Sequence, residues 1–455
     1  MKYIRAFSPS VFLSLWLAFA TPGWAQTVTL KPANASNIYN VGDKVTWDVT
    51  FNGTFAAPVN YTLKKNGLTV FQQGTLDPAS GNGRIETTLD EPAAILLEVQ
   101  NPSGANAAGG RRGGAGGGRV LAGALVAPEK LQPSSPRPAD FDAWWDAKIK
   151  QLHEIPINAN VTAGESGKTG VDYFQVQLDN INGTHVDGQL AKPAKEGKFP
   201  ALLILQWAGT YPLQKQWVTD RAAEGWLAFN IEPHDLPIDQ PAAFYTNEPS
   251  VRNYQAIGQD DREKSYFLRM YLSAYRALDY LAERPDWDGK TLVVMGTSMG
   301  GQQSISLAGL HPKVTALIVM VPSSCDMTGP EHGRAAGFPD WARDAQTKKN
   351  PAILETGRYF DPVNFASRIK VPALVAMGLF DETSPPAGVW SAINQMHGPV
   401  EPLPMVSGHQ NQNGGQAVYT ARSAEWLGTL VKGEALAPKT ISPAPSMPGF
   451  PSPAK

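Results

Sequence analysis

The sequence predicts an α/β protein with a mostly parallel central sheet, preceded by a small N-terminal β-sandwich-like domain. Three observations carry this prediction. In residues 128–435, short apolar runs alternate with helix-like stretches, which is typical of parallel strands joined by crossover helices. Residues 26–103 instead hold short alternating segments bounded by turn residues. A glycine-rich run separates the two parts.

The composition narrows the class of protein. The chain has 455 residues, and domains usually run to about 100–200 residues, so two or three domains are expected. Hydrophobic residues make up 42% and charged residues 18%, which is typical of a globular protein. The formal net charge is −2, whereas a nucleic-acid-binding protein is expected to carry an excess of basic residues, so nucleic acid is not an expected partner. A single cysteine, Cys325, excludes an intramolecular disulfide and a thiolate zinc cluster.

Residues 1–25 are predicted to form a secretory signal peptide. Lys2 and Arg5 precede an apolar run over 11–20, and the small residues Gly23 and Ala25 stand at the positions before a cleavage site. The alternative is an uncleaved anchor, but the run is shorter than the ~20 residues that span a bilayer. No later stretch is long and apolar enough, so we expect a secreted or periplasmic protein without stable membrane insertion.

The N-terminal domain is predicted from its strands. Residues 45–51 alternate with period two, and residues 61–63 and 95–99 are further strand candidates. Asn66-Gly67 is typical of a hairpin turn. Several short strands at regular spacing indicate a small β-sandwich. Its aromatic residues could bind carbohydrate, although packing in the core is the favoured interpretation.

Two segments are predicted to lack regular structure. In residues 104–118, 8 of 15 are glycine. We therefore interpret residues 104–127 as a flexible connector or exposed loop. At the other end of the chain, residues 436–455 are rich in proline and are predicted to form an extended tail.

The larger domain begins with helical and hairpin signals. Residues 140–149 follow two prolines and place their aromatic residues on one broad face, as in an amphipathic helix. Residues 173–178 and 185–190 alternate as a strand pair. A helix is predicted over 266–281. Buried strands are predicted over 201–205, 225–231, 291–295, 314–321 and 373–377.

Ser298 is the predicted nucleophile. The strand over 291–295 runs directly into Gly296-Thr-Ser298-Met-Gly300, which is the Gly-x-Ser-x-Gly pattern of a nucleophile elbow. The glycines are needed because side chains there would collide with neighbouring backbone. The pattern alone is weak, but the strand before it and the helical spacing over 302–310 give the expected context. The alternative is a tight turn without chemistry.

A serine hydroxyl needs a histidine base and an orienting carboxylate, which follow it in the order serine, acid, histidine on this fold. Four histidines follow Ser298: His311, His332, His397 and His409. His409 lies in a loop after a predicted strand and before a predicted helix, so it is the predicted base. His311 closes the helix that follows the elbow, and a structural role is expected for it.

Asp381 is the predicted acid. It follows the strand over 373–377, and residues at the carboxyl ends of strands face the ligand site in open α/β sheets. Its competitors are Glu382, the next residue, and Asp361, for which a structural role is the better interpretation.

Several segments resemble the acetyl xylan esterase / cephalosporin C deacetylase family, carbohydrate esterase family 7. They are Arg137–Trp145, Tyr275–Leu281, Gly296–Gly301, Tyr359–Ala366 and Pro385-Pro386, and the similarity spans roughly 131–431. The resemblance implies an α/β-hydrolase fold that removes acetyl groups from esterified sugars, such as xylan or xylo-oligosaccharides, without a metal or other cofactor. The family's triad matches Ser298, Asp381 and His409.

The sequence departs from the family at the oxyanion hole. The family usually has His-Gly-Tyr after its third strand, where this chain has Gln206-Trp-Ala-Gly-Thr210. A backbone donor does not depend on its side chain, so the hole can persist. We place it on the backbone N–H groups of Ala208 and Met299, with Trp207 as the second choice to Ala208.

The predicted function is that of a secreted serine esterase acting on acetylated carbohydrate. A general carboxylesterase or a dienelactone-type hydrolase is the alternative. A serine peptidase with a propeller is disfavoured, because a blade needs about 40–50 residues and only ~100 precede the larger domain. A catalytically inactive glycan-binding protein is the non-enzymatic alternative. The expected partner is an acetylated carbohydrate or small ester, and homo-oligomerisation is left open.

Overall fold

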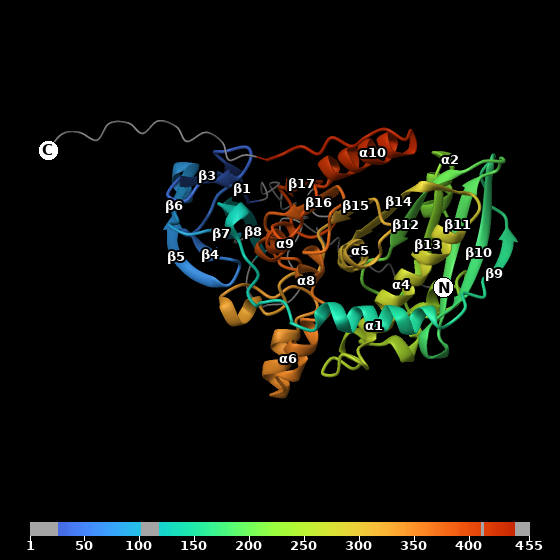
Figure 1. The fold of residues 1–455 in the computed structure, drawn as a ribbon. Helices are drawn as coiled ribbons and strands as arrows, with labels where there is room; N and C mark the ends of the chain where they lie inside the picture. Colours follow the sequence, from blue (N-terminus) through green and yellow to red (C-terminus); the bar gives the residue numbers. More distant parts are fainter. Residues whose placement is uncertain (1–25, 102–117, 411–413, 442–455) are drawn as a thin grey trace, which may run out of the picture.

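The structure, a computed structural model, describes residues 26–101, 118–410 and 414–441. It consists of a β-sandwich and a larger α/β part that lie against each other (Figure 1). The predicted signal segment, most of the glycine-rich run and the end of the proline-rich tail lie outside the described residues. Cleavage after Ala25 and export therefore stay predictions.

The α/β part is built on a nine-stranded sheet with the order β17-β16-β15-β14-β12-β13-β11-β10-β9. The neighbours from β13 to β17 run parallel, whereas β11, β10 and β9 are added antiparallel. The predicted mostly parallel sheet is thus confirmed. Its strands are β9 (Asn160–Gly164), β10 (Val171–Asp179), β11 (His185–Pro193), β12 (Phe199–Leu205), β13 (Leu227–Glu232), β14 (Trp287–Thr297), β15 (Ala316–Met320), β16 (Ala373–Gly378) and β17 (Val400–Met405).

Helices cover both faces of this sheet, because its central strands are apolar on both sides. On one face lie α2 (Gln216–Ala223) and α10 (Ala417–Val431). The other face carries α1 (Phe141–His153), α4 (Tyr266–Glu283), α5 (Met299–Leu310), α8 (Pro362–Ala366) and α9 (Pro386–Ile393). Successive residues of β12 point to opposite faces. Leu202 packs in the hydrophobic cluster under α2 and α10, and Leu203 packs in the cluster under α4 and α5.

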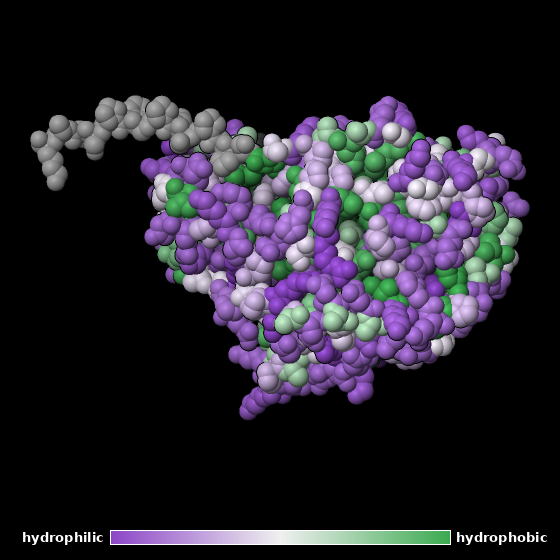
Figure 2. Space-filling model, in the orientation of Figure 1, coloured by the Kyte–Doolittle hydropathy of each residue, from purple (hydrophilic) through white to green (hydrophobic). Residues whose placement is uncertain are grey.

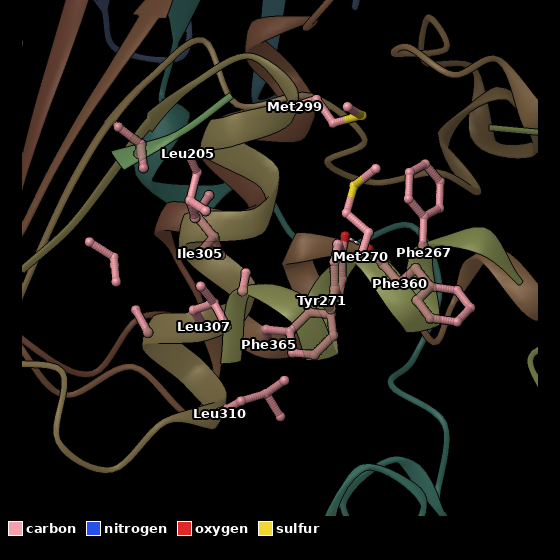
Figure 3. Packing of buried hydrophobic residues seen from close by; sticks show 14 of the residues in the cluster. Leu205, Phe267, Met270, Tyr271, Met299, Ile305, Leu307, Leu310, Phe360 and Phe365 are labelled. Atoms are coloured by element: carbon pink, nitrogen blue, oxygen red, sulfur yellow. Dashed lines mark hydrogen bonds between the residues drawn. The ribbon is translucent and has the colours of Figure 1, made fainter. Parts of the chain in front are cut away.

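Aromatic side chains fill the core beneath α4 and α5. Figure 3 shows Tyr271 among Phe267, Phe360 and Phe365, beside the apolar face of α5. The hydroxyl of Tyr271 donates a hydrogen bond to the carbonyl of Phe360 at 2.9 Å and accepts one from Gln302 of α5 at 2.7 Å. The helix that follows the elbow is therefore fixed by packing and by hydrogen bonds.

The N-terminal part is a sandwich of two sheets around one core, as the sequence predicts. One sheet has the order β1-β3-β6, with β1 (Thr27–Pro32), β3 (Lys44–Asn52) and β6 (Asn82–Thr88). The other has the order β2-β8-β7-β4-β5, with β2 (Ile38–Tyr39), β4 (Val59–Lys65), β5 (Thr69–Leu76), β7 (Ala93–Asn101) and β8 (Gly118–Val126). Trp47 is fully buried between them. Asn66 and Gly67 both have positive φ, as the predicted hairpin turn requires.

The prediction that residues 104–127 form a connector is wrong for its second part. Residues 118–126 form β8, which pairs with β7 along nine residues. The reason is burial on both faces: Ala122 and Ala124 belong to the core of the sandwich, whereas Leu121 and Leu125 pack into the core of the α/β part. The strand was missed because it begins where the glycine-rich run over 104–118 ends.

Strand β8 joins the sandwich to the loop that carries Asp381. Gly123 approaches this loop so closely that a Cβ on it would lie 2.0 Å from the carbonyl oxygen of Leu379. Arg119 of β8 forms an ion pair with Glu382 at 3.0 Å. In Figure 1 the N-terminal strands accordingly lie against α8 and α9, at the β17 end of the large sheet.

The surface is mainly hydrophilic on the face shown in Figure 2, where hydrophobic residues occur in small, scattered groups. Among the described residues, no helix is both long and apolar enough to cross a membrane. The first residues of the predicted tail, 436–441, contain no helix or strand, and the amide of Lys439 donates to the buried carboxylate of Glu401 at 2.9 Å. This part of the tail is therefore attached to the body of the protein.

Candidate active site

Ser298 lies at a sharp turn between β14 and α5. Its backbone has φ 56° and ψ −117°, a conformation that most residues avoid. A Cβ on Gly296 would lie 2.3 Å from the carbonyl carbon of Gly300, and a Cβ on Gly300 would lie 2.3 Å from the carbonyl oxygen of Leu205. Both glycines of the motif are thus required by close backbone contacts, as the elbow pattern predicts.

The three predicted triad residues come together. Nε2 of His409 lies 2.9 Å from Oγ of Ser298, and Nδ1 of His409 lies 2.8 Å from Oδ2 of Asp381. Asp381 comes from the loop after β16 and His409 from the loop after β17, so the ends of β14, β16 and β17 bring the three side chains to one edge of the sheet.

The hydrogen bonds show which atom of each group can donate and which can accept. Oδ1 of Asp381 accepts from the amides of Thr383 and Ser384 at 2.7 and 2.8 Å, which leaves Oδ2 for the Nδ1–H of His409. With its proton on Nδ1, a neutral imidazole presents Nε2 as an acceptor toward the hydroxyl of Ser298. This is the arrangement that general-base activation of a serine requires.

The alternatives for the base and the acid lie elsewhere. His311 is buried at the end of α5, with Nε2 3.4 Å from Asp279, and His332 lies in the exposed short helix 329–332. Asp361 caps α8 by accepting from the amide of Val363, and burial raises its pKa to about 7. Glu382 pairs with Arg119 instead of the imidazole.

The two backbone donors predicted for the oxyanion hole come from different elements. Met299 is the first residue of α5, and the amides in the first turn of a helix have no intrahelical carbonyl to bind. Ala208 lies in the loop that leaves β12, the strand that pairs with β14 next to the elbow. The start of this loop touches the elbow where Leu205 meets Gly300.

Sequence reasoning did not select Tyr211, His234 or Tyr254, whose side chains contact the loop that carries Ala208. A signal was available for His234, because this histidine follows the buried strand β13 at the edge of the sheet where ligands bind. Tyr254 lies in a short helix, Tyr254–Ala256, within a stretch without apolar periodicity, so no pattern marks it.

A hollow of about 860 Å³ lies between the sandwich and the α/β part. It is lined by the Asn66–Leu68 turn on one side and by the Asp381-Glu382 loop on another. A second hollow of about 410 Å³ adjoins it, because both are lined by Ala336, Asp340, Arg343 and Glu382. The second hollow also reaches Gln255, which follows Tyr254. The sandwich therefore forms one wall of a groove beside the loop that carries Asp381.

The sequence of the chain is also similar to those of known proteins. The sequence model of the acetyl xylan esterase (AXE1) family matches residues 124–430. The acetyl esterase Axe7A of Xylanibacter ruminicola is 33% identical over 284 residues, which cover 61% of this chain and 64% of that protein. The chain thus spans slightly less than two thirds of the length of that curated relative.

Two solved structures have a similar fold. The acetyl xylan esterase from Paenibacillus sp. R4 superposes with a TM-score of 0.59 at 23% identity, covering 66% of this chain and 97% of its own. Acetyl xylan esterase 1 from Thermoanaerobacterium sp. JW/SL YS485 also gives 0.59, at 19% identity, covering 67% and 97%. The α/β-hydrolase fold predicted for the larger domain is thereby confirmed. The family match begins at residue 124, so it does not include strands β1 to β7.

Proposed function

The chain belongs to the acetyl xylan esterase (AXE1) family, and from this membership we propose that it hydrolyses acetyl esters of carbohydrates, such as acetylated xylan or xylo-oligosaccharides. The observation that carries the proposal is the relay of two hydrogen bonds, of 2.9 and 2.8 Å, that links Ser298 through His409 to Asp381. Ser298 is the proposed nucleophile, His409 the base and Asp381 the orienting acid.

In the first half of the proposed reaction, Nε2 of His409 removes the hydroxyl proton of Ser298 while Oγ attacks the acetyl carbonyl carbon. The carbonyl oxygen becomes an oxyanion, which accepts hydrogen bonds from the backbone amides of Ala208 and Met299. One such donor is worth about 10²–10³ in rate. The intermediate then expels the sugar hydroxyl, which takes its proton from His409, and an acetyl-enzyme remains.

In the second half, water replaces the sugar. His409 removes a proton from this water, whose oxygen attacks the acetyl carbon through a second oxyanion. Acetic acid leaves as the bond to Oγ breaks and the proton returns from His409 to Ser298, and the acid then releases its remaining proton to solvent as acetate. Throughout, Asp381 keeps the imidazole in the tautomer whose Nε2 can accept a proton and stabilises the imidazolium that forms.

The substrate class is tested by measuring acetate release from acetylated xylan, acetylated xylo-oligosaccharides, acetylated monosaccharides and an aryl acetate. The proposal expects hydrolysis of the acetylated sugars with kcat/KM at least equal to that for the aryl ester. Turnover of aryl or alkyl esters with no release from any acetylated sugar would instead support a general carboxylesterase. Hydrolysis of a dienelactone, again without release from any acetylated sugar, would support the remaining alternative, a dienelactone-type hydrolase.

We further propose that the groove between the sandwich and the α/β part receives the sugar units next to the acetylated one. Its volume lies within the range of about 300–1,000 Å³ that is typical of ligand sites. Charged side chains that can bind sugar hydroxyls line it, including Asp340, Arg343 and Glu382. Acetyl transfer itself takes place at the triad and the oxyanion hole, so the groove would affect only substrates long enough to reach it.

Arg343→Ala is therefore expected to raise KM for an acetylated xylo-oligosaccharide by about 5- to 10-fold, the effect of losing one typical hydrogen bond. KM and kcat for an aryl acetate should stay unchanged. Arg84→Ala is the matched control, because Arg84 is also an exposed arginine paired with an aspartate, Asp48, but lies outside the groove. Equal changes with both substrates would contradict this placement.

A further inference from the structure

The loop that carries Ala208 is held by side chains at three consecutive peptide groups. The hydroxyl of Tyr211 donates to the carbonyl of Trp207 at 2.9 Å. The amide of Gly209 donates to the hydroxyl of Tyr254 at 3.4 Å. Nε2 of His234 lies 3.0 Å from the carbonyl oxygen of Gly209.

The first of these contacts bears directly on the amide of Ala208. The carbonyl of Trp207 and the N–H of Ala208 belong to one planar peptide group, in which they point in opposite directions. A hydrogen bond that fixes the carbonyl therefore fixes the direction of the N–H. The other two contacts fix the next two peptide groups, so the Ala208 amide cannot turn by rotation of its neighbours.

His234 can serve this role in only one protonation form. A carbonyl oxygen only accepts, so Nε2 carries the proton, and Nδ1 accepts from the hydroxyl of Tyr266 at 2.8 Å. Burial lowers the pKa of His234 to about 4, which keeps this neutral form at neutral pH. Its backbone is fixed as well, because Oε2 of the buried Glu232 side chain accepts from the amides of His234 and Leu236.

Tyr254 connects this loop to the second predicted oxyanion donor. Its hydroxyl accepts from Gly209 and lies 3.2 Å from Sδ of Met299. The ring of Tyr254 packs against the imidazole of His234, with 4.6 Å between ring centroids. Burial raises the pKa of both Tyr211 and Tyr254, so their hydroxyls keep the protons that they donate.

We propose that Tyr211, His234 and Tyr254 are positioning residues for the oxyanion hole, which orient the backbone amide of Ala208 before the substrate arrives. None of the three has a contact with Ser298, His409 or Asp381 among the hydrogen bonds of the described residues, so they act through the loop alone. This inference rests on the proposed esterase function. It predicts that loss of these side chains reduces the stabilisation of the transition state more than it reduces the affinity for substrate.

The test uses Tyr211→Phe and His234→Leu in the full chain, with an aryl acetate as substrate. Each variant is expected to lower kcat by about 10- to 100-fold, since small displacements of a catalytic donor have effects of this size. KM should stay within twofold of the wild-type value. His234→Gln, whose amide can again donate to Gly209, should recover part of the lost rate.

A trifluoromethyl ketone separates this role from a general structural one. Ser298 adds to the ketone carbonyl, its proton passes to His409, and the carbonyl oxygen becomes an oxyanion in the same hole. Affinity for the ketone should fall in parallel with kcat in Tyr211→Phe and His234→Leu. Failure of the wild-type enzyme to bind the ketone would contradict the proposed function itself, and not the positioning role alone.

Two variants are matched controls for the loss of a buried polar contact elsewhere. His311→Leu removes a buried histidine bonded to Asp279, and Tyr280→Phe removes a buried hydroxyl bonded to Arg284. Both should leave kcat and ketone affinity within twofold. The proposal is overturned if Tyr211→Phe keeps the wild-type kcat, or if the controls lose as much. Because Tyr211→Phe is nearly isosteric, the test stands even where His234→Leu does not fold.

Discussion

Ser298→Ala is expected to lower kcat for acetyl ester hydrolysis by about 10⁴- to 10⁶-fold, the largest loss that any single side chain of this protein should cause. Alanine leaves no oxygen to attack the carbonyl, so no acetyl-enzyme can form. Residual hydrolysis would come from binding and from the oxyanion hole acting on water. The fold should be unaffected, because the hydroxyl of Ser298 hydrogen-bonds only to His409 among the described side chains.

Two measurements make this expectation specific. Wild-type protein should be labelled by a fluorophosphonate, which reacts with an activated serine, and Ser298→Ala should not be labelled. Ser306→Ala is the matched control, because Ser306 is also fully buried and lies on α5, where its hydroxyl bonds to the carbonyl of Gln302. This variant should retain labelling and most of its activity. A Ser298→Ala protein with more than a tenth of the wild-type kcat would exclude Ser298 as the nucleophile.

The meeting of Ser298, Asp381 and His409 was predictable because each residue follows a buried strand. Parallel strands present their carboxyl ends at one edge of the sheet, so chain order and strand position together bring the three side chains close. The glycines of the elbow were informative for the same physical reason, since only glycine permits the backbone contacts of Gly296 and Gly300.

Strand β8 shows where such reasoning fails. It follows directly on the glycine-rich run over 104–118, and glycine-rich composition favours a flexible connector over a strand. The segment is ordered by its neighbours: β7 pairs along its whole length, and the two hydrophobic cores enclose it from opposite sides. Close approach of Gly123 to Leu379 needs a residue without a side chain. Gly123 is thus a point of contact between the two parts of the protein.

The contacts around Ala208 were not predictable for a different reason. Each joins a side chain to a backbone carbonyl or amide, and backbone groups are the same in every residue. The partners also lie far apart in the chain, as Gly209, His234 and Tyr254 do. Neither the hydrophobic periodicity of the sequence nor a sequence motif indicates such pairs. They emerge only when the fold brings the ends of β12 and β13 together, since these strands are neighbours in the sheet.

Asp381→Asn is expected to lower kcat by about 10⁴-fold, the size of effect known for the loss of this carboxylate in a serine triad. The geometry explains why. Oδ1 of Asp381 accepts from the amides of Thr383 and Ser384, so the carbonyl oxygen of an asparagine would occupy this place. Its NH₂ group would then face Nδ1 of His409, which must become an acceptor. The proton moves to Nε2, and the imidazole can no longer accept the proton of Ser298.

The same substitution one residue further along the chain is the matched control. Glu382→Gln removes a carboxylate from the same loop and weakens its ion pair with Arg119, but it leaves both hydrogen bonds of His409 intact. Its kcat for an aryl acetate, which is too short to use the groove, should stay within a few-fold of the wild-type value, and the melting temperature of both variants should be close to that of the wild type. If Glu382→Gln loses as much activity as Asp381→Asn, the loss reflects disturbance of the loop, and the assignment of the acid to Asp381 fails. Asp381 and Glu382 both lie in the loop that follows β16. What distinguishes the two carboxyl groups is that only Asp381 points toward Nδ1 of His409.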